Sequence, residues 1–199
     1  MSAAPVEVVV LVDEDGHPVG TAPKATVHDH QTPLHLAFSC YIFDHEDRLL
    51  LTRRALSKPT WPGTWTNSFC GHPAPAEDIF EAVRRRARQE LGISLDHLQL
   101  TLPAFRYDAT MANGTRENEL CPVFTATTPD EIRPEPSEVD DFEWVPWADF
   151  RDEVLGGERD VSPWSVQQVG ELTARATGTG FSSAPTSELP PAARDSTAA

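Results

Sequence analysis

The residues Trp61-Pro62-Gly63-Thr64-Trp65-Thr66-Asn67-Ser68-Phe69-Cys70-Gly71-His72-Pro73 stand directly before a predicted helix and form the most specific pattern in the chain. This stretch places a thiol, a glycine and an imidazole in consecutive positions. We expect the helix over residues 77–91, because apolar side chains from Ile79 to Leu91 recur on one face. Gly92 is a typical helix C-terminus. The alternative is an amphipathic helix that simply follows a Pro/Gly loop.

The predicted helix also carries a spaced set of glycine and charged residues. The set consists of Gly71, Glu77, Arg85, Glu90, Gly92 and Ile93. Its spacing resembles the Nudix motif, whose acidic residues hold metal ions on a diphosphate. Arg86 and Gln89 stand where that motif usually has glutamates. A motif altered in this way, preceded by residues 66–73, resembles that of the type I isopentenyl-diphosphate isomerases.

The resemblance to this isomerase family extends from about Val8 to Trp164, which is most of the chain. It implies an α/β fold, a Nudix-type sandwich of mixed β-sheets flanked by helices. A length of 199 residues suits a single domain, to which we assign residues 1–176. Residues 177–199 are dominated by Gly, Ser, Thr, Pro and Ala, so we expect a disordered C-terminal tail.

Composition and charge argue against several classes of protein. The chain has 39% hydrophobic and 24% charged residues, as globular proteins do, and no apolar run long enough for a membrane helix. It has neither a basic-then-apolar leader nor a cysteine pattern typical of disulfides, so we expect a cytoplasmic protein with free thiols. The net charge of −15 argues against nucleic acid and anionic membranes as partners.

An anionic substrate would need a local basic pocket in so acidic a protein. Much of the acid lies between Asp130 and Asp141, whereas cationic residues gather near the stretch 61–73 and on the helix. Guanidinium groups bind phosphate oxygens in a two-pronged way. The candidates for a diphosphate clamp are Arg54, Lys58 and Arg86, followed by Lys24 and Arg53. For Arg84 and Arg88 we favour the alternative, a solvated basic face.

The remaining pattern predicts a series of short elements. Apolar and β-branched runs predict strands over residues 6–12, 18–22, 34–43, 48–54, 98–107, 115–126 and 141–145. Turn residues occupy 13–16, 44–47 and 111–114, and a loop rich in proline and acid covers 127–137. Two further helices are expected over residues 146–155 and 163–176.

Glu117 and Glu119 occupy alternate positions of a predicted strand, so both carboxylates point to one side. Two neighbouring acids repel each other unless they share a proton or a cation, although solvated glutamates on an edge strand are an alternative. In the isomerase family, the residues that match His28, His35, His72, Glu117 and Glu119 form one metal site. That ligand set suits Zn, Mn or Fe better than Mg alone. His30 is the alternative to His28.

The resemblance implies a second metal ion as well, a Mg that Glu90 holds against the diphosphate. Magnesium keeps several waters and binds through one or two carboxylates plus substrate phosphates, so a single acid is sufficient. The alternative is a surface glutamate paired with Arg86.

Cys70 is the candidate acid/base group among the three cysteines. It lies at a loop-to-helix junction, where a helix N-terminus can favour a thiolate, whereas Cys40 and Cys121 are expected to be packed. The resemblance implies that Glu119, near a metal and hydrogen-bonded to Tyr107, protonates the substrate while Cys70 exchanges the proton on the other face. It also implies that Trp164 covers the hydrocarbon tail, since an indole face stabilises positive charge. The residues alone leave open which group protonates.

Together these features predict a metal-dependent isomerase that interconverts isopentenyl and dimethylallyl diphosphate in isoprenoid biosynthesis. The ligand would be a small diphosphate, and because family members are often monomeric we expect a monomer. One alternative is a Nudix hydrolase, which Arg86 and Gln89 disfavour because they replace two metal ligands, and which has no use for Cys70. The other is a non-catalytic diphosphate-binding module.

Overall fold

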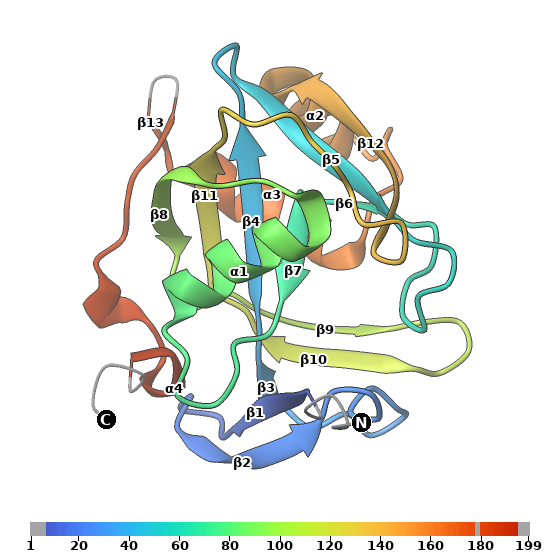
Figure 1. Ribbon diagram of the computed structural model, residues 1–199, viewed down its shortest axis with the longest axis vertical. Helices are drawn as coiled ribbons and strands as arrows, with labels where there is room; N and C mark the ends of the chain where they lie inside the picture. Colours follow the sequence, from blue (N-terminus) through green and yellow to red (C-terminus); the bar gives the residue numbers. More distant parts are fainter. Residues whose placement is uncertain (1–6, 178–179, 195–199) are drawn as a thin grey trace, which may run out of the picture.

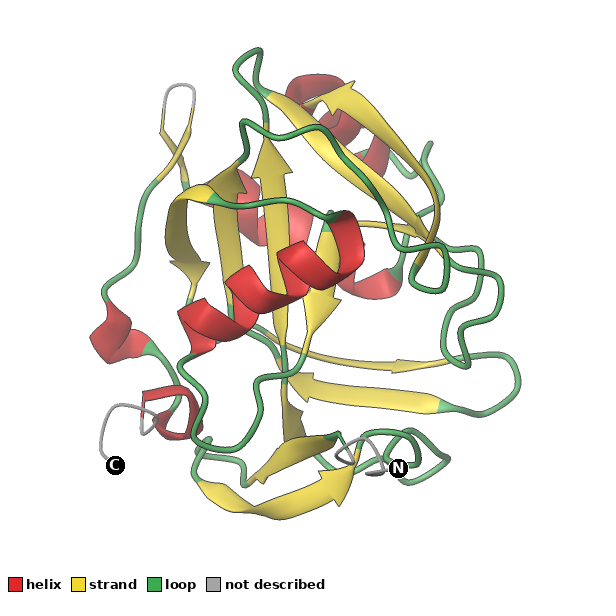
Figure 2. Ribbon diagram, in the orientation of Figure 1, coloured by secondary structure: helices red, strands yellow, loops and turns green. Residues whose placement is uncertain are grey.

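The computed structural model describes residues 7–177 and 180–194, which form two β-sheets flanked by helices (Figures 1 and 2). The first sheet has the strand order β2-β1-β3-β10-β9 and the second the order β12-β5-β4-β11-β8. The first contains β1 (Val8–Val12), β2 (Pro18–Pro23), β3 (His35–Leu36), β9 (Arg106–Thr110) and β10 (Arg116–Leu120). The second contains β4 (Phe38–Phe43), β5 (Arg48–Arg54), β8 (Asp96–Leu102), β11 (Val123–Thr127) and β12 (Val139–Pro146).

The central strand β4 is buried on both faces, and its alternate side chains enter two separate apolar clusters. Phe38, Cys40 and Ile42 pack in one cluster with α1 (Ile79–Leu91). Tyr41 packs in the other with α2 (Trp147–Leu155) and α3 (Pro163–Ala174). Figure 1 shows α1 on one face of the sheet and the other two helices behind it. The predicted α/β sandwich of mixed sheets flanked by helices is confirmed.

Three of the predicted strands are wrong in extent, because the chain changes sheet inside each of them. Residues 34–43 divide into β3 and β4 at Ala37, and residues 115–126 divide into β10 and β11. Strand β3 pairs with β10 and β4 with β11, both in parallel, and at the change of sheet the Ala37 N–H donates to Leu120 O at 2.9 Å. Residues 98–107 divide in the same way into β8 and β9. Pro103 and Pro122 stand at two of these breaks and have no N–H for a ladder.

The stretch before α1 is more regular than a loop. It contains β6 (Trp65–Thr66), paired with β5, and β7 (Phe69–Gly71), paired with β4. The helix begins at Ile79, two residues later than predicted, because Asp78 accepts hydrogen bonds from the N–H groups of Phe80 and Glu81. It ends as predicted before Gly92, whose backbone adopts the left-handed conformation with φ 67°. Cys70 therefore lies in a strand and not at the helix start.

The prediction of a disordered tail from residue 177 is wrong for the residues that the structure describes there. We call residues 180–194 the C-terminal strap; it contains β14 (Gly180–Phe181), the 3-10 turn Thr186–Glu188 and α4 (Pro191–Arg194). Ala184, Leu189 and Ala193 are buried in the same cluster as α1. These small and apolar side chains pack where the composition suggested solvent. Residues 178–179 and 195–199 lie outside the described part.

The remaining predicted elements agree with the structure to within a few residues. Helix α3 ends at Ala174 and is followed by β13 (Ala176–Thr177). Residue 6, where the first strand was predicted to begin, lies outside the described residues, and β1 starts at Val8. None of the helices in the described segments is long and apolar enough to cross a membrane.

Candidate active site

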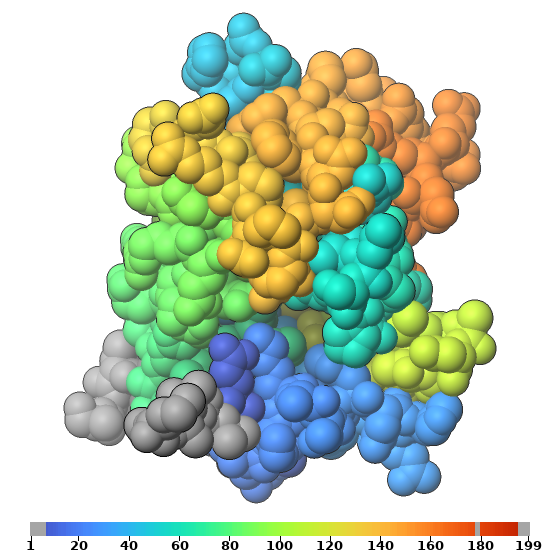
Figure 3. All heavy atoms as spheres, turned by 45° about the vertical axis from the view of Figure 1, so that its right-hand side comes forward, coloured from blue at the N-terminus to red at the C-terminus, as the bar shows by residue number. Residues whose placement is uncertain are grey.

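Residues from many elements line one pocket of about 650 Å³. Figure 3 shows the surface hollowed where the blue N-terminal part, the teal segment after β5 and the yellow-green hairpin of β9 and β10 meet. The pocket wall includes nearly all the residues that the sequence singled out. They are Lys24, His28, Arg54, Lys58, Cys70, His72, Arg86, Tyr107, Glu117, Glu119 and Trp164.

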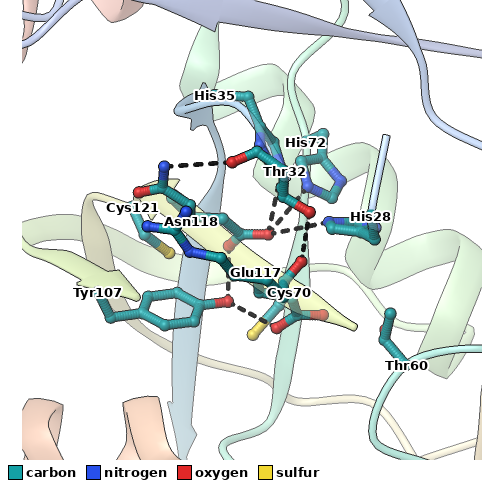
Figure 4. Close-up of polar contacts among 12 residues, drawn as sticks. His28, Thr32, His35, Thr60, Cys70, His72, Tyr107, Glu117, Asn118 and Cys121 are labelled. Atoms are coloured by element: carbon teal, nitrogen blue, oxygen red, sulfur yellow. Dashed lines mark hydrogen bonds and ion pairs between the residues drawn. The ribbon is translucent and has the colours of Figure 1, made fainter. Parts of the chain in front are cut away.

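Three imidazoles converge on a single carboxylate oxygen (Figure 4). The Nε2 atoms of His28, His35 and His72 lie 3.7, 3.4 and 3.2 Å from Glu119 Oε1. The fold brings them together because His35 on β3 is the direct neighbour of Glu119 on the parallel strand β10. His30 points elsewhere, with its Nδ1 2.9 Å from Gly114 O.

The donor atoms of this group suit a metal ion. They all lie within 4.8 Å of one another, and the buried Nε2 atoms of His28 and His35 have no hydrogen-bond partner among the described residues. Nδ1 of His35 lies 2.9 Å from Pro33 O, so this nitrogen donates and Nε2 keeps its lone pair for a ligand. An unpartnered buried nitrogen is costly unless something outside the protein binds it.

The members of this group differ in how readily they lose a proton. Burial lowers the pKa of His72 to about 4, so its imidazole is neutral at pH 7. Burial alone would raise the pKa of Glu119, but the three neighbouring histidines hold it well below its usual value. Burial alone would lower the pKa of His35, but the Glu119 carboxylate outweighs it and raises that pKa above its usual value. Neutral imidazoles and an ionised carboxylate are the forms that bind metal, so a bound ion would displace a proton from His35.

Glu117 lies beside this group but is not one of its four closely spaced members. The Tyr107 hydroxyl lies 3.0 Å from Glu117 Oε2 and 2.8 Å from Glu119 Oε2, and it donates at this position. Burial, and next the charge of Glu119, raise the pKa of Glu117. The predicted contact between Tyr107 and Glu119 is therefore present, and Tyr107 links both carboxylates.

Cys70 borders the same pocket from strand β7. Its Sγ lies 3.3 Å from Asn67 Oδ1 and 3.3 Å from Ser39 Oγ. The expectation that a helix N-terminus favours a thiolate is wrong, because burial raises the pKa of Cys70 to about 12. The group is a thiol at neutral pH. Cys40 and Cys121 are fully buried, as expected, and all three cysteines are free.

The cationic wall of the pocket consists of Lys24, Arg54, Lys58 and Arg86. Arg54 donates from Nε and Nη2 to Thr60 O at 3.1 and 2.9 Å, which fixes its guanidinium group. The fifth candidate, Arg53, does not line the pocket and instead pairs with Asp140 Oδ2 at 2.6 Å.

Two acidic side chains hold Arg86 in place. Glu90, one turn further along α1, is buried and pairs with Arg86, and it does not line the pocket. Glu138 does line the pocket and contacts both Arg86 and Lys58. We expected the acidic residues between Asp130 and Asp141 to lie away from the cationic residues of the pocket, and Glu138 contradicts this expectation.

Trp164 is almost fully buried, and its ring meets the pocket beside Tyr107, with ring centroids 5.5 Å apart. Its Nε1 donates to Asn67 Oδ1 at 3.0 Å. Asn67 thus holds both Trp164 and Cys70, a role that the sequence reasoning missed although Asn67 stands inside the quoted stretch. Thr60, Ser39 and Glu138 were missed as well, because no local pattern distinguishes them from ordinary polar residues.

The chain is similar to known proteins over most of its length. A model of the NUDIX domain matches residues 33–165. An isopentenyl-diphosphate Delta-isomerase of Clavibacter sepedonicus is 56% identical over 82% of this chain and 86% of its own length. One from Saccharopolyspora erythraea is 54% identical over 84% and 86%, and one from Mycolicibacterium vanbaalenii 52% over 86% and 94%.

The chain belongs to the isopentenyl-diphosphate Delta-isomerase family, within the Nudix domain proteins.

Solved structures of other proteins share the fold of this isomerase family member. A crystal structure from Deinococcus radiodurans aligns with a TM-score of 0.64 at 19% identity, covering 82% of this chain and 98% of that one. A MutT NUDIX hydrolase from Burkholderia pseudomallei gives 0.55 at 22% identity, covering 70% and 98%. At such identities the likeness concerns the fold alone. The isomerase family member differs from the Nudix motif at Arg86, whose side chain enters the pocket where a glutamate is usual.

Proposed function

We propose that this enzyme interconverts isopentenyl diphosphate and dimethylallyl diphosphate, a step of isoprenoid biosynthesis. The observation that carries the proposal is that one pocket wall combines three features: the cationic residues, the Cys70 thiol, and the Glu119 carboxylate with its hydrogen bond from Tyr107. A diphosphate needs the first feature, and moving a double bond needs proton donors and acceptors. The identity of 50 to 56% with relatives named isopentenyl-diphosphate Delta-isomerase supports the same reaction.

The chemistry follows from how weak a base an alkene is. Protonation at one end of the double bond creates tertiary carbocation character, and removal of a proton from the neighbouring carbon leaves the shifted double bond. We assign the first proton to Glu119, with Tyr107 as its hydrogen-bond donor, and the removal of a proton at the other side to Cys70. This step starts with a protonated Glu119 and a Cys70 thiolate and ends with an ionised Glu119 and a Cys70 thiol. The last two forms are the ones favoured in this structure, so the reverse reaction starts from them. Trp164 lies in the wall beside them and offers an aromatic face for positive charge. A closed pocket must exclude water, which would trap the cation.

The histidine and glutamate group would hold a divalent transition metal, Mn or Zn, through His28, His35, His72, Glu117 and Glu119. Imidazole nitrogens with carboxylates suit these ions. When bound, such an ion supplies a positive charge that favours the ionised form of a coordinated carboxylate. The unpartnered nitrogens of His28 and His35 support this assignment.

The cationic wall would bind the diphosphate through Lys24, Arg54, Lys58 and Arg86. We assign a Mg ion to the same ligand, with Glu90 as its protein carboxylate. Because Glu90 pairs with Arg86 in this structure, diphosphate binding has to separate that pair or share it.

A proton NMR time course with isopentenyl diphosphate and Mg tests the proposal. We expect the vinyl methyl signals of dimethylallyl diphosphate to appear. Released phosphate instead would indicate a Nudix hydrolase, and an unchanged spectrum would indicate a binding module.

Cys70→Ala should lower the rate of isomerisation by roughly 10² to 10⁴, the usual contribution of an acid/base group. Cys40→Ala should cost stability and leave turnover per folded molecule unchanged, because Cys40 is fully buried on the α1 side of β4.

A further inference from the structure

A chain of buried polar side chains lies behind Cys70. It consists of Tyr41 and Ser39 on β4 and Gln168 on α3, all with no exposed surface. None of the three belongs to the described residues that line the pocket. Polar groups this deep in a core are expensive unless each has a partner, so their arrangement calls for a reason.

The direction of each hydrogen bond in this chain can be assigned. The Tyr41 hydroxyl donates to Gln168 Oε1 at 2.9 Å, which fixes the orientation of the amide. The Gln168 Nε2 group therefore faces Ser39 and donates to its Oγ at 2.9 Å. Since a hydroxyl has a single hydrogen, the hydrogen of Ser39 is left for one of the two sulfur atoms nearby.

Those sulfur atoms belong to Cys70, at 3.3 Å from Ser39 Oγ, and Cys121, at 3.4 Å. The Asn67 amide is also fixed, because its Nδ2 donates to two backbone carbonyls at 3.0 and 2.8 Å. Its Oδ1 therefore faces Cys70 and accepts the thiol hydrogen at 3.3 Å. With its own hydrogen engaged there, the Cys70 sulfur has lone pairs for the Ser39 hydroxyl, while the Cys121 thiol is free to donate to Ser39 Oγ.

We propose that Ser39 is a positioning residue for Cys70: its hydroxyl donates to the Cys70 sulfur, in a direction imposed by Gln168 and Tyr41. An O–H donor aimed at sulfur stabilises the negative charge that develops as the thiol proton leaves. Because the donor is already oriented, little reorganisation is needed at that moment. The effect on turnover rests on the proposed isomerase function, whereas the contact itself does not.

Infrared spectroscopy of the thiol S–H stretch tests the contact without any substrate. The Cys70 band is identified as the one that Cys70→Ala removes. Ser39→Ala should shift this band to higher frequency, because hydrogen bonds in a chain strengthen one another and the bond to Asn67 loses that support. Tyr41→Phe, which keeps the shape of the side chain, should shift it in the same direction by less.

Steady-state kinetics tests the consequence. Ser39→Ala should lower kcat roughly tenfold or more, the effect of losing a hydrogen bond to a charged group. The KM for isopentenyl diphosphate should not change, since Ser39 does not line the pocket. Tyr41→Phe should show a smaller fall in kcat, again at constant KM, and provides the test if Ser39→Ala does not fold.

Thr101→Val is the matched control. Thr101 is fully buried and bonds through its hydroxyl to Thr125 Oγ1 at 3.0 Å, so the substitution removes a comparable hydrogen bond elsewhere in the sheet. It should lower stability and leave both kcat and the Cys70 band unchanged. An unmoved Cys70 band in Ser39→Ala and Tyr41→Phe overturns the proposal, as does a KM that rises as much as kcat falls. If the wild-type enzyme forms no dimethylallyl diphosphate, the proposed function is wrong. The infrared result would still test the hydrogen bond from Ser39 to Cys70.

Discussion

Glu138 places a carboxylate in a pocket that has to receive an anion. It contacts the side chains of Lys58 and Arg86, two members of the cationic wall. Burial alone would raise the pKa of Glu138, but the hydrogen bond and charge of Lys58, with help from Arg86, hold it below its usual value. Glu138 is therefore ionised at neutral pH and neutralises part of the wall before any ligand arrives.

Replacing this carboxylate should make the pocket a better anion site. We expect Glu138→Gln to bind inorganic pyrophosphate about tenfold more tightly in the presence of Mg, because one charge repulsion of this size is removed. Isothermal titration calorimetry measures the affinity. Glu135→Gln is the control, since Glu135 is exposed and outside the pocket wall, and it should not change the affinity. Weaker binding by Glu138→Gln would mean that Glu138 assists the ligand.

The convergence of imidazoles on Glu119 predicts a metal that survives dialysis. His72→Ala removes one nitrogen donor and should lose most of the bound Mn or Zn, with metal content measured by elemental analysis of the dialysed protein. His30→Ala provides the comparison, because His30 is exposed and its Nδ1 lies at hydrogen-bond distance from Gly114 O, outside the histidine and glutamate group. Equal metal content in the wild type and in His72→Ala would contradict the proposed site.

For single residues, the sequence predicts those whose spacing or motif is distinctive and misses those whose role depends on packing. The neighbourhood of His28, His35, His72 and Glu119, and the contact of Tyr107, follow from pattern and resemblance. The thiol form of Cys70 and the position of Glu138 do not, because burial and the return of a distant loop determine them. Neither property leaves a trace in the adjacent sequence.

Arg86 lies on helix α1 and lines the pocket, so the residue at which the helix begins affects the position of this side chain. Asp78 accepts from the N–H groups of Phe80 and Glu81 at 2.9 and 3.1 Å. These N–H groups have no partner inside the helix and would otherwise depend on water. The cap therefore fixes where the helix starts and, with it, the rotation of its buried face.

Removing the cap should cost measurable stability. We expect Asp78→Ala to lower the free energy of unfolding by about 1 kcal/mol, the usual value for an N-cap aspartate. Urea denaturation measures the change. Asp149→Ala is the matched substitution, because Asp149 lies in the first turn of α2, where no side chain caps the helix. A loss in Asp149→Ala as large as that in Asp78→Ala would show that helix-end charge, and not the cap bond, is responsible.

The elements themselves were predictable wherever their pattern is local. The strand over residues 48–54 and the helix ending before Gly92 depend on short apolar periods and a glycine stop. The divisions at residues 37, 103–105 and 121–122 were not visible, because the apolar run continues while the chain moves from one sheet to the other. A change of sheet is a tertiary event, and both halves remain buried.

The C-terminal strap connects distant parts of the whole molecule. The Ala184 N–H donates to Leu100 O on β8 at 2.8 Å. Further along, the Ala192 N–H donates to Gly16 O at 2.9 Å, in the turn between β1 and β2. The strap thus touches an outer strand of one sheet and the first hairpin of the other, as Figure 1 shows for α4 beside β1 and β2. Few large side chains are needed, because backbone hydrogen bonds and small residues make the contact.

Shortening the chain should therefore destabilise the enzyme. A protein that ends at Thr177 should unfold at a lower temperature than the full chain in a calorimetric scan. Leu189→Ala should cost roughly 2 to 5 kcal/mol, as buried leucines do. Leu155→Ala, at an exposed leucine, should cost no more than about 0.5 kcal/mol. An unchanged melting temperature for the shortened protein would show that the strap contributes nothing to stability.

The contact between Ala192 and Gly16 also sets an order of events during translation. The first hairpin emerges from the ribosome long before Ala192, its partner in the strap, is made. At about 5 to 20 residues per second, the interval between the two is roughly 9 to 35 seconds. Throughout that time the nascent hairpin exposes the surface that the strap later covers. Chaperones that bind unfinished chains therefore have their longest opportunity at this end of the molecule, and a late premature stop codon would leave it uncovered permanently.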